Sequence, residues 1–160
     1  MRIVIQEAKN ASVTSEGTLC GTIGSGEVLL VGFEPTDDEK VVDLMIQKLL
    51  KLRIFEDENG MTNLSLAQKG GSILAVSQFT LYADVRHGNR PSFTSCMKPD
   101  EARVLFDYFK KVLKEQYSDC GFGVFQTAME VTLTNVGPFT ILLDSDELGI
   151  KGDKIIWKYY

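Results

Sequence analysis

Alternating hydrophobic and polar positions dominate the first fifth of the chain. Ile3 and Ile5 alternate with Arg2 and Gln6, and a period of two is typical of a strand with one buried face. The alternation resumes after each group of small and polar residues that marks a turn. It predicts strands over residues 1–8, 12–14, 18–23 and 27–33, with turns at Glu16-Gly17 and Gly24-Ser25-Gly26.

Two segments instead repeat their hydrophobic residues at helical spacing. The first follows Thr36-Asp37-Asp38-Glu39, a capping-box pattern in which the Thr36 hydroxyl and the Glu39 carboxylate satisfy free N–H groups reciprocally. The second begins at Pro99, which suits a first helical turn, and the carboxylates of residues 100–101 interact favourably with the positive end of the helix dipole there. The apolar faces comprise Val42, Met45, Ile46, Leu49 and Leu50 in the first helix and Ala102, Leu105, Phe106, Phe109 and Val112 in the second.

Three further hydrophobic segments are interpreted as strands of the same core. Residues 72–79 are the most apolar, and residues 127–134 and 139–143 follow near the other end of the chain. Asp57-Glu58-Asn59-Gly60 predicts a turn between two shorter segments. Strands outnumber helices, and the helices come singly instead of in regular βαβ units. We therefore expect a single α+β domain, with a curled, largely antiparallel sheet or barrel flanked by two main helices.

Length and composition indicate the size, the metal content and the cellular location to expect. The 160 residues suit one domain, and the three cysteines form no C-x-x-C pair, which argues against both a disulfide framework and a zinc site. No apolar run approaches the roughly 20 residues that span a membrane, and no signal peptide is evident. We expect a cytoplasmic protein with no bound metal and no cofactor.

The net charge of −5 limits how much nucleic acid the protein can contact. Broad phosphate contact needs a basic face, so any RNA partner is expected to be touched over a small area at one end. Arg86 and Arg90, in the segment Arg86-His87-Gly88-Asn89-Arg90, are the candidates for holding that end. An ordinary solvated loop is the alternative interpretation.

Hydroxyl and amide side chains gather at Ser77-Gln78-Phe79-Thr80, where the apolar strand stops. Ser77 and Thr80 are weak nucleophiles without a base, Gln78 cannot take a proton, and His87, the single histidine, falls in a Gly-containing loop. These features argue against a Ser-His-Asp triad. What remains is catalysis by positioning, with backbone N–H groups and hydroxyls donating to a bound carbonyl oxygen. The alternative is that Ser and Thr merely end a strand.

Taken together, two motifs resemble those of the D-aminoacyl-tRNA deacylases. Ser77-Gln78-Phe79-Thr80-Leu81 follows an apolar strand, and Asn135-Val136-Gly137-Pro138-Phe139-Thr140 supplies a late Gly-Pro-x-Thr. The likeness extends to residues 1–6, 11–13 and 90–93 and covers roughly the first nine-tenths of the chain. We assign residues 1–144 to a deacylase-like catalytic domain and residues 145–160 to a C-terminal extension. Residues 154–160 are apolar and aromatic enough to dock on a surface or add an edge strand.

The resemblance implies a homodimeric ester hydrolase that releases D-amino acids from the 3′ end of aminoacyl-tRNA. The terminal adenosine is held near residues 77–80, and its own ribose hydroxyl assists the reaction. Gly137-Pro138 is expected to be cis and to enter the partner subunit's pocket, where its carbonyl oxygens receive the substrate's amino group and exclude an L side chain. Met129 resembles a pocket-lining methionine of the family, and a core methionine is the alternative.

Glu7 departs from the family pattern, which has arginine at this position. A glutamate supplies only acceptors, so another cation from a neighbouring segment is expected to brace the Gly137-Pro138 loop. The departure keeps open a second hypothesis, a sister deacylase that clears another mischarged tRNA. A third hypothesis is a non-catalytic module that binds the end of a nucleic acid.

Overall fold

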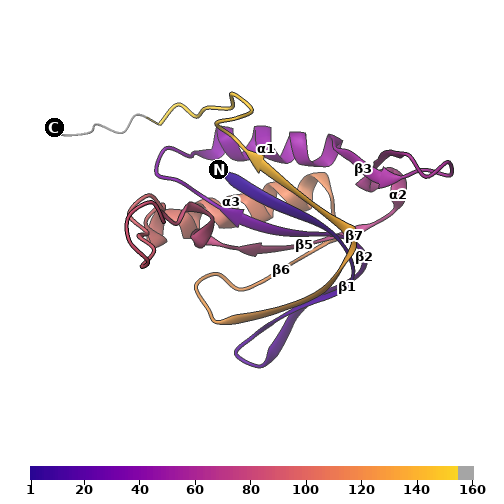
Figure 1. Ribbon diagram of the computed structural model, residues 1–160, viewed down its shortest axis with the longest axis horizontal. Coiled ribbons are helices and arrows are strands. Elements are labelled where there is room, and N and C mark those ends of the chain that lie inside the picture. Colours follow the sequence, from indigo (N-terminus) through magenta and orange to yellow (C-terminus); the bar gives the residue numbers. More distant parts are fainter. Residues whose placement is uncertain (155–160) are drawn as a thin grey trace.

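A curled five-stranded sheet carries two long helices on one face (Figure 1). The computed structural model describes residues 1–154. The strands lie in the order β6-β5-β2-β1-β7. Their bounds are Arg2–Ser15 for β1, Thr18–Gly32 for β2, Ser72–Ser77 for β5, Cys120–Phe122 for β6 and Met129–Asp144 for β7. The helices are α1 (Glu39–Lys51), α2 (Leu66–Lys69) and α3 (Pro99–Gln116), and β3 (Arg53–Glu56) pairs with β4 (Thr62–Ser65) in a separate hairpin.

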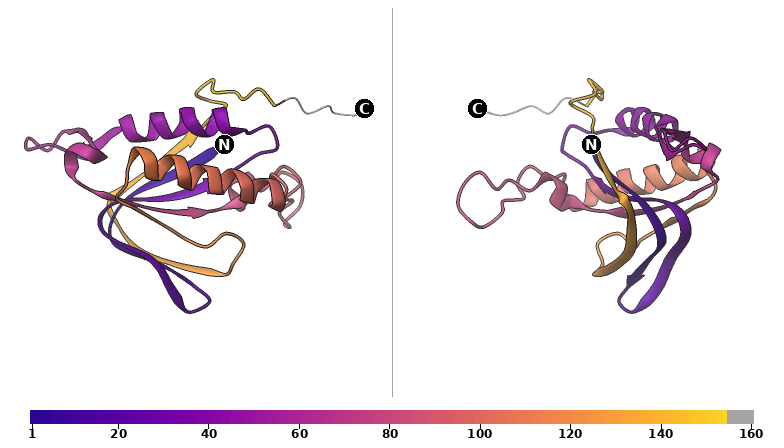
Figure 2. Two further views of the ribbon diagram at one scale, coloured as in Figure 1. Left: turned by 180° about the vertical axis from the view of Figure 1, so that it is seen from behind. Right: turned by 45° about the vertical axis from the view of Figure 1, so that its right-hand side comes forward.

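Antiparallel pairing holds the long strands together. β1 runs antiparallel to both β2 and β7, whereas β5 is parallel to β2 and to β6. The paired ends of β1, β2 and β7 curl beyond the helices, as the right-hand view of Figure 2 shows. The expected α+β class, with a largely antiparallel curled sheet and two main helices, is confirmed.

The two faces of the sheet bury two hydrophobic clusters. The larger lies between the sheet and helices α1 and α3, and it includes the stacked rings of Phe106 and Phe109, 5.9 Å apart between centroids. The smaller lies on the other face, where Val28, Leu74 and Val76 meet residues of the curled part of β1. Alternation along β2 sends successive side chains to opposite clusters, which is why this central strand is apolar on both faces.

Two local predictions were wrong. Gly24-Ser25-Gly26 lies inside β2, not in a turn. Gly26 has φ +152° and a side chain there would overlap the backbone of Ser72, so glycine allows β5 to start close against β2. The cap of α1 is Asp38, not Thr36: the Asp38 carboxylate accepts from the N–H of Val41 at 3.1 Å.

Other elements follow the pattern more closely. Pro99 occupies the first turn of α3, and the predicted apolar residues of that helix are buried. Asp57 accepts hydrogen bonds from the N–H groups of Asn59 and Met61 in the predicted turn between β3 and β4. The two late strands prove to be one strand, β7, whose register with β1 shifts across the Gly-Pro segment and again between Lys9 and Ser12. The short helix α2 was missed, although Ser65 and Gln68 form its capping box.

The N-terminus lies beside the segment before α1 and the residue that follows β7. The Met1 ammonium donates to Asp37 and to Ser145, each at 2.7 Å. Residues 145–154 then run past α1 and α3, where Lys154 forms an ion pair with Glu101 at 2.6 Å. The interpretation of residues 154–160 as a docking or edge-strand segment falls almost wholly outside the described residues. None of the described helices has both the length and the hydrophobicity needed to cross a bilayer.

Candidate active site

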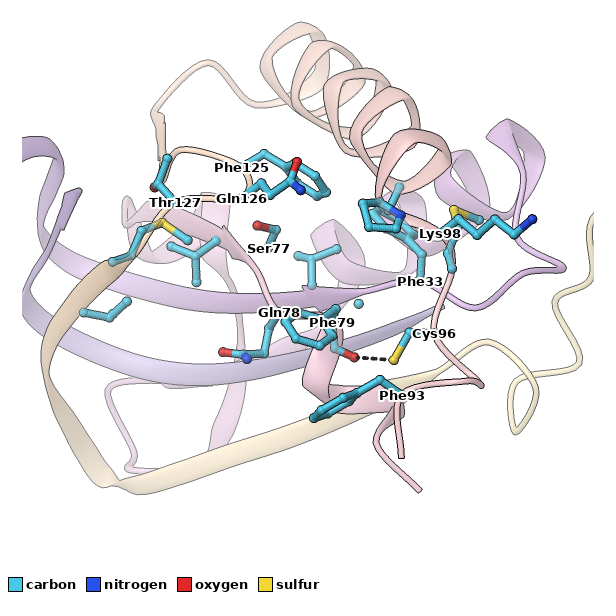
Figure 3. Close-up of a pocket in the computed structure, with 18 of the residues that line it drawn as sticks. Phe33, Ser77, Gln78, Phe79, Phe93, Cys96, Lys98, Phe125, Gln126 and Thr127 are labelled. Atoms are coloured by element: carbon cyan, nitrogen blue, oxygen red, sulfur yellow. Dashed lines mark hydrogen bonds between the residues drawn. The ribbon is translucent and has the colours of Figure 1, made fainter. Parts of the chain in front are cut away.

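A cavity of about 710 Å³ opens where β2 and β5 end and α3 begins. Figure 3 shows Ser77, Gln78 and Phe79 on one side of it and Phe125, Gln126 and Thr127 facing them from the segment before β7. The N-terminal end of α3, with its cap residue Lys98, and the two preceding residues, Cys96 and Met97, complete the wall. The cavity therefore forms between segments that are far apart in the sequence, and the Ser-Gln-Phe motif lies in its wall.

The motif bends sharply because β5 stops at Ser77. The N–H of Gln78 still donates to the carbonyl of Val31 on β2, at 2.7 Å, and the chain then enters a single 3₁₀ turn, η1 (Phe79–Tyr82). The N–H of Leu81 closes this turn on the carbonyl of Gln78. Within residues 1–154 the N–H groups of Phe79 and Thr80 have no hydrogen-bond partner, so both are available as donors.

Side-chain contacts fix the turn from both sides. The Gln78 amide donates to the Thr80 hydroxyl, and the Cys96 thiol donates to the carbonyl of Phe79 at 3.3 Å (Figure 3). The rings of Phe79 and Phe93 meet edge to face with centroids 5.1 Å apart. Thr80 is exposed and lies outside the cavity wall, whereas Ser77, Gln78 and Phe79 line it.

Titratable groups are scarce in the wall. Among the described residues that line the cavity only Lys98 and Cys96 ionise, and burial raises the pKa of the Cys96 thiol. His87 lies exposed in the loop before Arg90 and is not in the wall. Residues 1–154 contain no cluster of three or more His, Cys, Asp or Glu that would hold a metal ion. Among residues 1–154 the wall therefore offers hydrogen-bond donors to a bound carbonyl but no carboxylate or imidazole base.

The Gly-Pro segment lies in an exposed part of β7, and the peptide bond between Gly137 and Pro138 is cis, as expected. Asn135 braces the loop, because its side chain accepts from the N–H of Phe139 and donates to the Thr140 hydroxyl, both at 2.9 Å. Neither Gly137 nor Pro138 lines the cavity of its own chain.

The bracing cation that we expected in place of arginine is not found. No ion pair or cation–π contact within the described part of the chain involves residues 136–139. Glu7 instead lies directly opposite Glu27 in the β1–β2 pairing. Burial raises the pKa of Glu7, and nearby Lys69 opposes that rise. The side-chain amide of Asn135, which both donates and accepts hydrogen bonds, therefore braces the Gly137-Pro138 loop in place of the cation that we expected.

The remaining predicted site residues divide between the wall and the surface. Met129, at the start of β7, lines the cavity. Arg86 and Arg90 do not: both lie exposed in the loop that Asp84 and Ser92 close as an isolated bridge. Arg86 forms an ion pair with Asp84 at 2.6 Å, and its hydrogen bonds hold the pKa of that carboxyl at about 2.

Sequence reasoning missed several wall residues. Cys96, Lys98, Phe125 and Gln126 carry no motif, and they approach the turn only because α3 and the segment before β7 pack beside it. Phe93 had a weak signal, since it belongs to the Arg-Pro-Ser-Phe segment that the resemblance includes.

Gly32 offers a direct test of the turn's importance. A Cβ at Gly32 would lie 2.8 Å from the Gln78 carbonyl oxygen and 3.1 Å from Leu81 Cβ. We expect Gly32→Ala to displace the turn and to reduce ligand binding or catalysis about tenfold or more, since overpacking costs about 1–3 kcal/mol. Gly24→Ala on the same strand is the matched control, because nothing lies within 4 Å of that Cβ position. Equal activity of both variants, measured under identical conditions, would show that the turn tolerates displacement.

Known proteins share both the sequence and the fold of this chain. A family model described as D-Tyr-tRNA(Tyr) deacylase matches residues 4–144. A D-aminoacyl-tRNA deacylase of Kosmotoga olearia is 50% identical over 145 residues, which cover 91% of this chain and 97% of that protein. A second, from Thermomicrobium roseum, is 51% identical over 148 residues, which cover 92% and 96% of the two chains.

Solved structures agree with these relatives. One described as the c-Myc DNA Unwinding Element Binding Protein has a TM-score of 0.85 and 38% identity, covering 91% of this chain and 99% of that chain. Another, described as a probable eukaryotic D-amino acid tRNA deacylase, has the same fold with a TM-score of 0.76 at 18% identity, over 89% and 97% of the two chains. The resemblance stated from the motifs is thus confirmed, and the chain belongs to the D-aminoacyl-tRNA deacylase family.

Proposed function

We propose that this protein is a D-aminoacyl-tRNA deacylase that hydrolyses the ester between a D-amino acid and the 3′ end of tRNA. Family membership over residues 4–144 carries the activity. The finer proposal is a cytoplasmic homodimer, in which each cavity receives the aminoacylated terminal adenosine. The placement of the aminoacyl ester rests on a single observation, the cavity with the N–H groups of Phe79 and Thr80 beside it, which have no partner among the described residues.

The chemistry follows from the donors and from the absence of a base in the described wall. The ester carbonyl points its oxygen toward the N–H groups of Phe79 and Thr80, and these donors stabilise the oxyanion that forms when water attacks. A donor of this kind is worth about 3–4 kcal/mol. Because the wall offers no carboxylate or imidazole, the neighbouring ribose hydroxyl of the tRNA itself assists the attack. Ser77 and Gln78 position the substrate and keep the turn in place.

Discrimination between D- and L-aminoacyl groups is assigned to the Gly137-Pro138 loop. The loop is exposed and does not line its own cavity, which supports the proposal that it enters the cavity of a second copy. Its carbonyl oxygens accept hydrogen bonds from the ammonium of the aminoacyl group. In this arrangement a D side chain points into open space beside Met129, whereas an L side chain meets the backbone of the loop. Selection by exclusion needs no ionisable side chain.

One panel of substrates separates this function from its two rivals. Purified protein is incubated with D-tyrosyl-tRNA, with several mischarged L-aminoacyl-tRNAs and with glycyl-tRNA, while release of the amino acid is timed. The proposal predicts rapid release of D-tyrosine. Preferred release from another mischarged tRNA would favour the sister deacylase, and tight binding of uncharged tRNA without any release would favour the binding module.

Thr80→Ala is expected to slow deacylation only partially, by about tenfold. The reason is that the Thr80 hydroxyl already accepts from Gln78 and lies outside the wall, so it holds the turn instead of attacking the ester. Single-turnover release of D-tyrosine measures the rate. Mass spectrometry of the reaction mixture supplies the opposing outcome, since an aminoacyl group trapped on Thr80 would make it the nucleophile.

Arg86 and Arg90 are proposed to contact phosphates near the tRNA end. Asp84 already pairs with Arg86, so Arg90 is expected to contribute more of the binding. The double Arg86→Gln/Arg90→Gln variant should weaken tRNA binding and lower the slope of log affinity against log salt by about one to two. Lys48→Gln in α1 is the control. An unchanged salt slope in the double variant would return both arginines to ordinary surface.

A further inference from the structure

A partly buried charged cluster lies beside η1 without entering the cavity wall. It consists of Arg2 on β1, Asp144 at the end of β7 and Tyr82 at the end of η1. Asp144 and Tyr82 are buried, with 7% of each exposed. The mechanism above assigns none of these three residues a role, yet their contacts reach the turn that carries the two N–H donors.

Arg2 makes three different contacts with this surrounding. Its Nε donates to Asp144 Oδ2 at 2.8 Å, and one terminal nitrogen donates to the carbonyl oxygen of Leu81 at 2.8 Å. Its guanidinium carbon also lies 4.5 Å from the centroid of the Tyr82 ring. The planar guanidinium can make these contacts at the same time, whereas a lysine ammonium, a single compact charge, cannot make all three.

Backbone geometry explains why Arg2 can reach the turn. Arg2 pairs with Gly32 on one side and with Asp144 on the other. Gly32 has no side chain, and the position that a Cβ would take is filled by the approach of Gln78 and Leu81. The turn therefore sits directly against the strand next to Arg2, and the carbonyl of Leu81 comes within reach of the guanidinium.

We propose that Arg2, oriented by Asp144, is a positioning residue that locks η1 and so aims the N–H groups of Phe79 and Thr80 at the substrate carbonyl. Arg2 holds the C-terminal half of a four-residue turn whose N-terminal half carries the donors. The turn has only a few backbone hydrogen bonds of its own, so loss of the hydrogen bond from Arg2 to the Leu81 carbonyl is expected to increase its motion. This inference rests on the proposed deacylase mechanism, and it concerns alignment of the donors, not substrate affinity.

Kinetics of three variants test the inference. Arg2→Met keeps the aliphatic stem and removes the guanidinium, and we expect kcat for D-tyrosyl-tRNA to fall about tenfold with KM unchanged within about twofold. Asp144→Asn should have a smaller effect, and the double variant should be no slower than Arg2→Met, because both act through one contact. Arg2→Lys should restore part of kcat. A normal kcat in Arg2→Met, or additive losses in the double variant, would overturn the proposal.

Amide hydrogen exchange tests the same lock without any assay of activity. The N–H groups of Leu81 and Ala83 close η1, and in Arg2→Met we expect both to exchange about tenfold faster. In Arg2→Met the N–H of Asp57, in the β3–β4 hairpin, should exchange at its wild-type rate. Arg53→Met is the control variant, because Arg53 also donates to a backbone carbonyl, and in it the N–H groups of η1 should exchange at their wild-type rates. Faster exchange together with inactive wild-type protein would refute the deacylase function alone. Unchanged exchange at Leu81 and Ala83 would refute the lock.

Discussion

Glu27→Leu is expected to raise the free energy of unfolding by several kcal/mol at pH 8 and by much less at pH 5. Glu27 is 1% exposed, and neither of its carboxylate oxygens has a hydrogen-bond partner among the described residues. Burial, with a smaller contribution from Glu7 opposite, raises its pKa from 4.5 to about 8. The folded protein therefore keeps a proton on Glu27 at neutral pH.

The direction of the pH dependence follows from this difference. Below about pH 4.5 the carboxyl is protonated in both states, so its titration does not affect stability, whereas above that value the unfolded chain releases the proton and the folded chain does not. Stability is therefore lost as the pH rises from about 4.5 to about 8, at up to about 1.4 kcal/mol per pH unit, and the loss levels off above pH 8. The full difference amounts to at most about 5 kcal/mol.

Urea unfolding of wild type and Glu27→Leu at pH 5, 6, 7 and 8 measures the effect. The difference in the free energy of unfolding between Glu27→Leu and wild type should widen with pH. Glu27→Gln also lacks the titrating carboxyl, so its difference from wild type should widen in the same way. It should be less stable than Glu27→Leu at every pH, because its buried amide stays unpaired. Glu130→Leu, at an exposed position of β7, is the matched control. A gap that stays constant across this range would mean that Glu27 does not titrate on unfolding.

Gly137→Ala is expected to abolish most deacylation, by about a hundredfold, while the chain still folds. Gly137 has φ +119°, in the region that L side chains avoid, and a Cβ there would lie 3.2 Å from the Phe139 nitrogen. A strained backbone of this kind costs about 1–3 kcal/mol and shifts the loop that is proposed to hold the substrate's amino group. Gly17→Ala, at a φ of +82° in the β1–β2 turn, controls for strain at a glycine away from the site.

Mixed dimers show which cavity the loop serves. Phe79→Pro removes one of the two N–H donors, so this variant should be inactive but still present an intact Gly-Pro loop. Inactive Gly137→Ala and inactive Phe79→Pro chains, mixed in equal amounts and allowed to exchange, should regain about a quarter of the wild-type rate. Half of the dimers are then mixed, and each has one intact site. A loop that serves its own chain would give no recovery at all.

Sequence patterns were sufficient for the architecture and for the motif at the end of β5. Helical spacing after Pro99 placed α3 and its buried face, and alternation placed the paired strands. The errors arose where tertiary approach outweighs local preference. Gly26 resembles a turn residue but serves close contact with Ser72, and Thr36 fits a capping box but Asp38 caps the helix.

The candidate site was predictable only in part, for a similar reason. Ser77, Gln78 and Phe79 line the cavity and were predicted because a motif carries them, and Met129 was predicted because it resembles a pocket-lining methionine of the family. Cys96 and Lys98 reach the wall through the packing of α3, and Arg2 reaches η1 across Gly32, which no local pattern reveals. The brace of the Gly-Pro loop was assigned to a cation because arginine is absent at position 7, but the side chain of Asn135 is already in place.

We propose that this protein releases D-amino acids from tRNA and rejects the L form by exclusion. The most direct measurement is single-turnover hydrolysis of D-tyrosyl-tRNA and L-tyrosyl-tRNA, each at the same excess of purified protein and corrected for spontaneous hydrolysis. A clash worth about 3 kcal/mol predicts release from the D substrate at least about a hundredfold faster than from the L substrate. Equal rates for the two, or release of neither above the spontaneous rate, would contradict it.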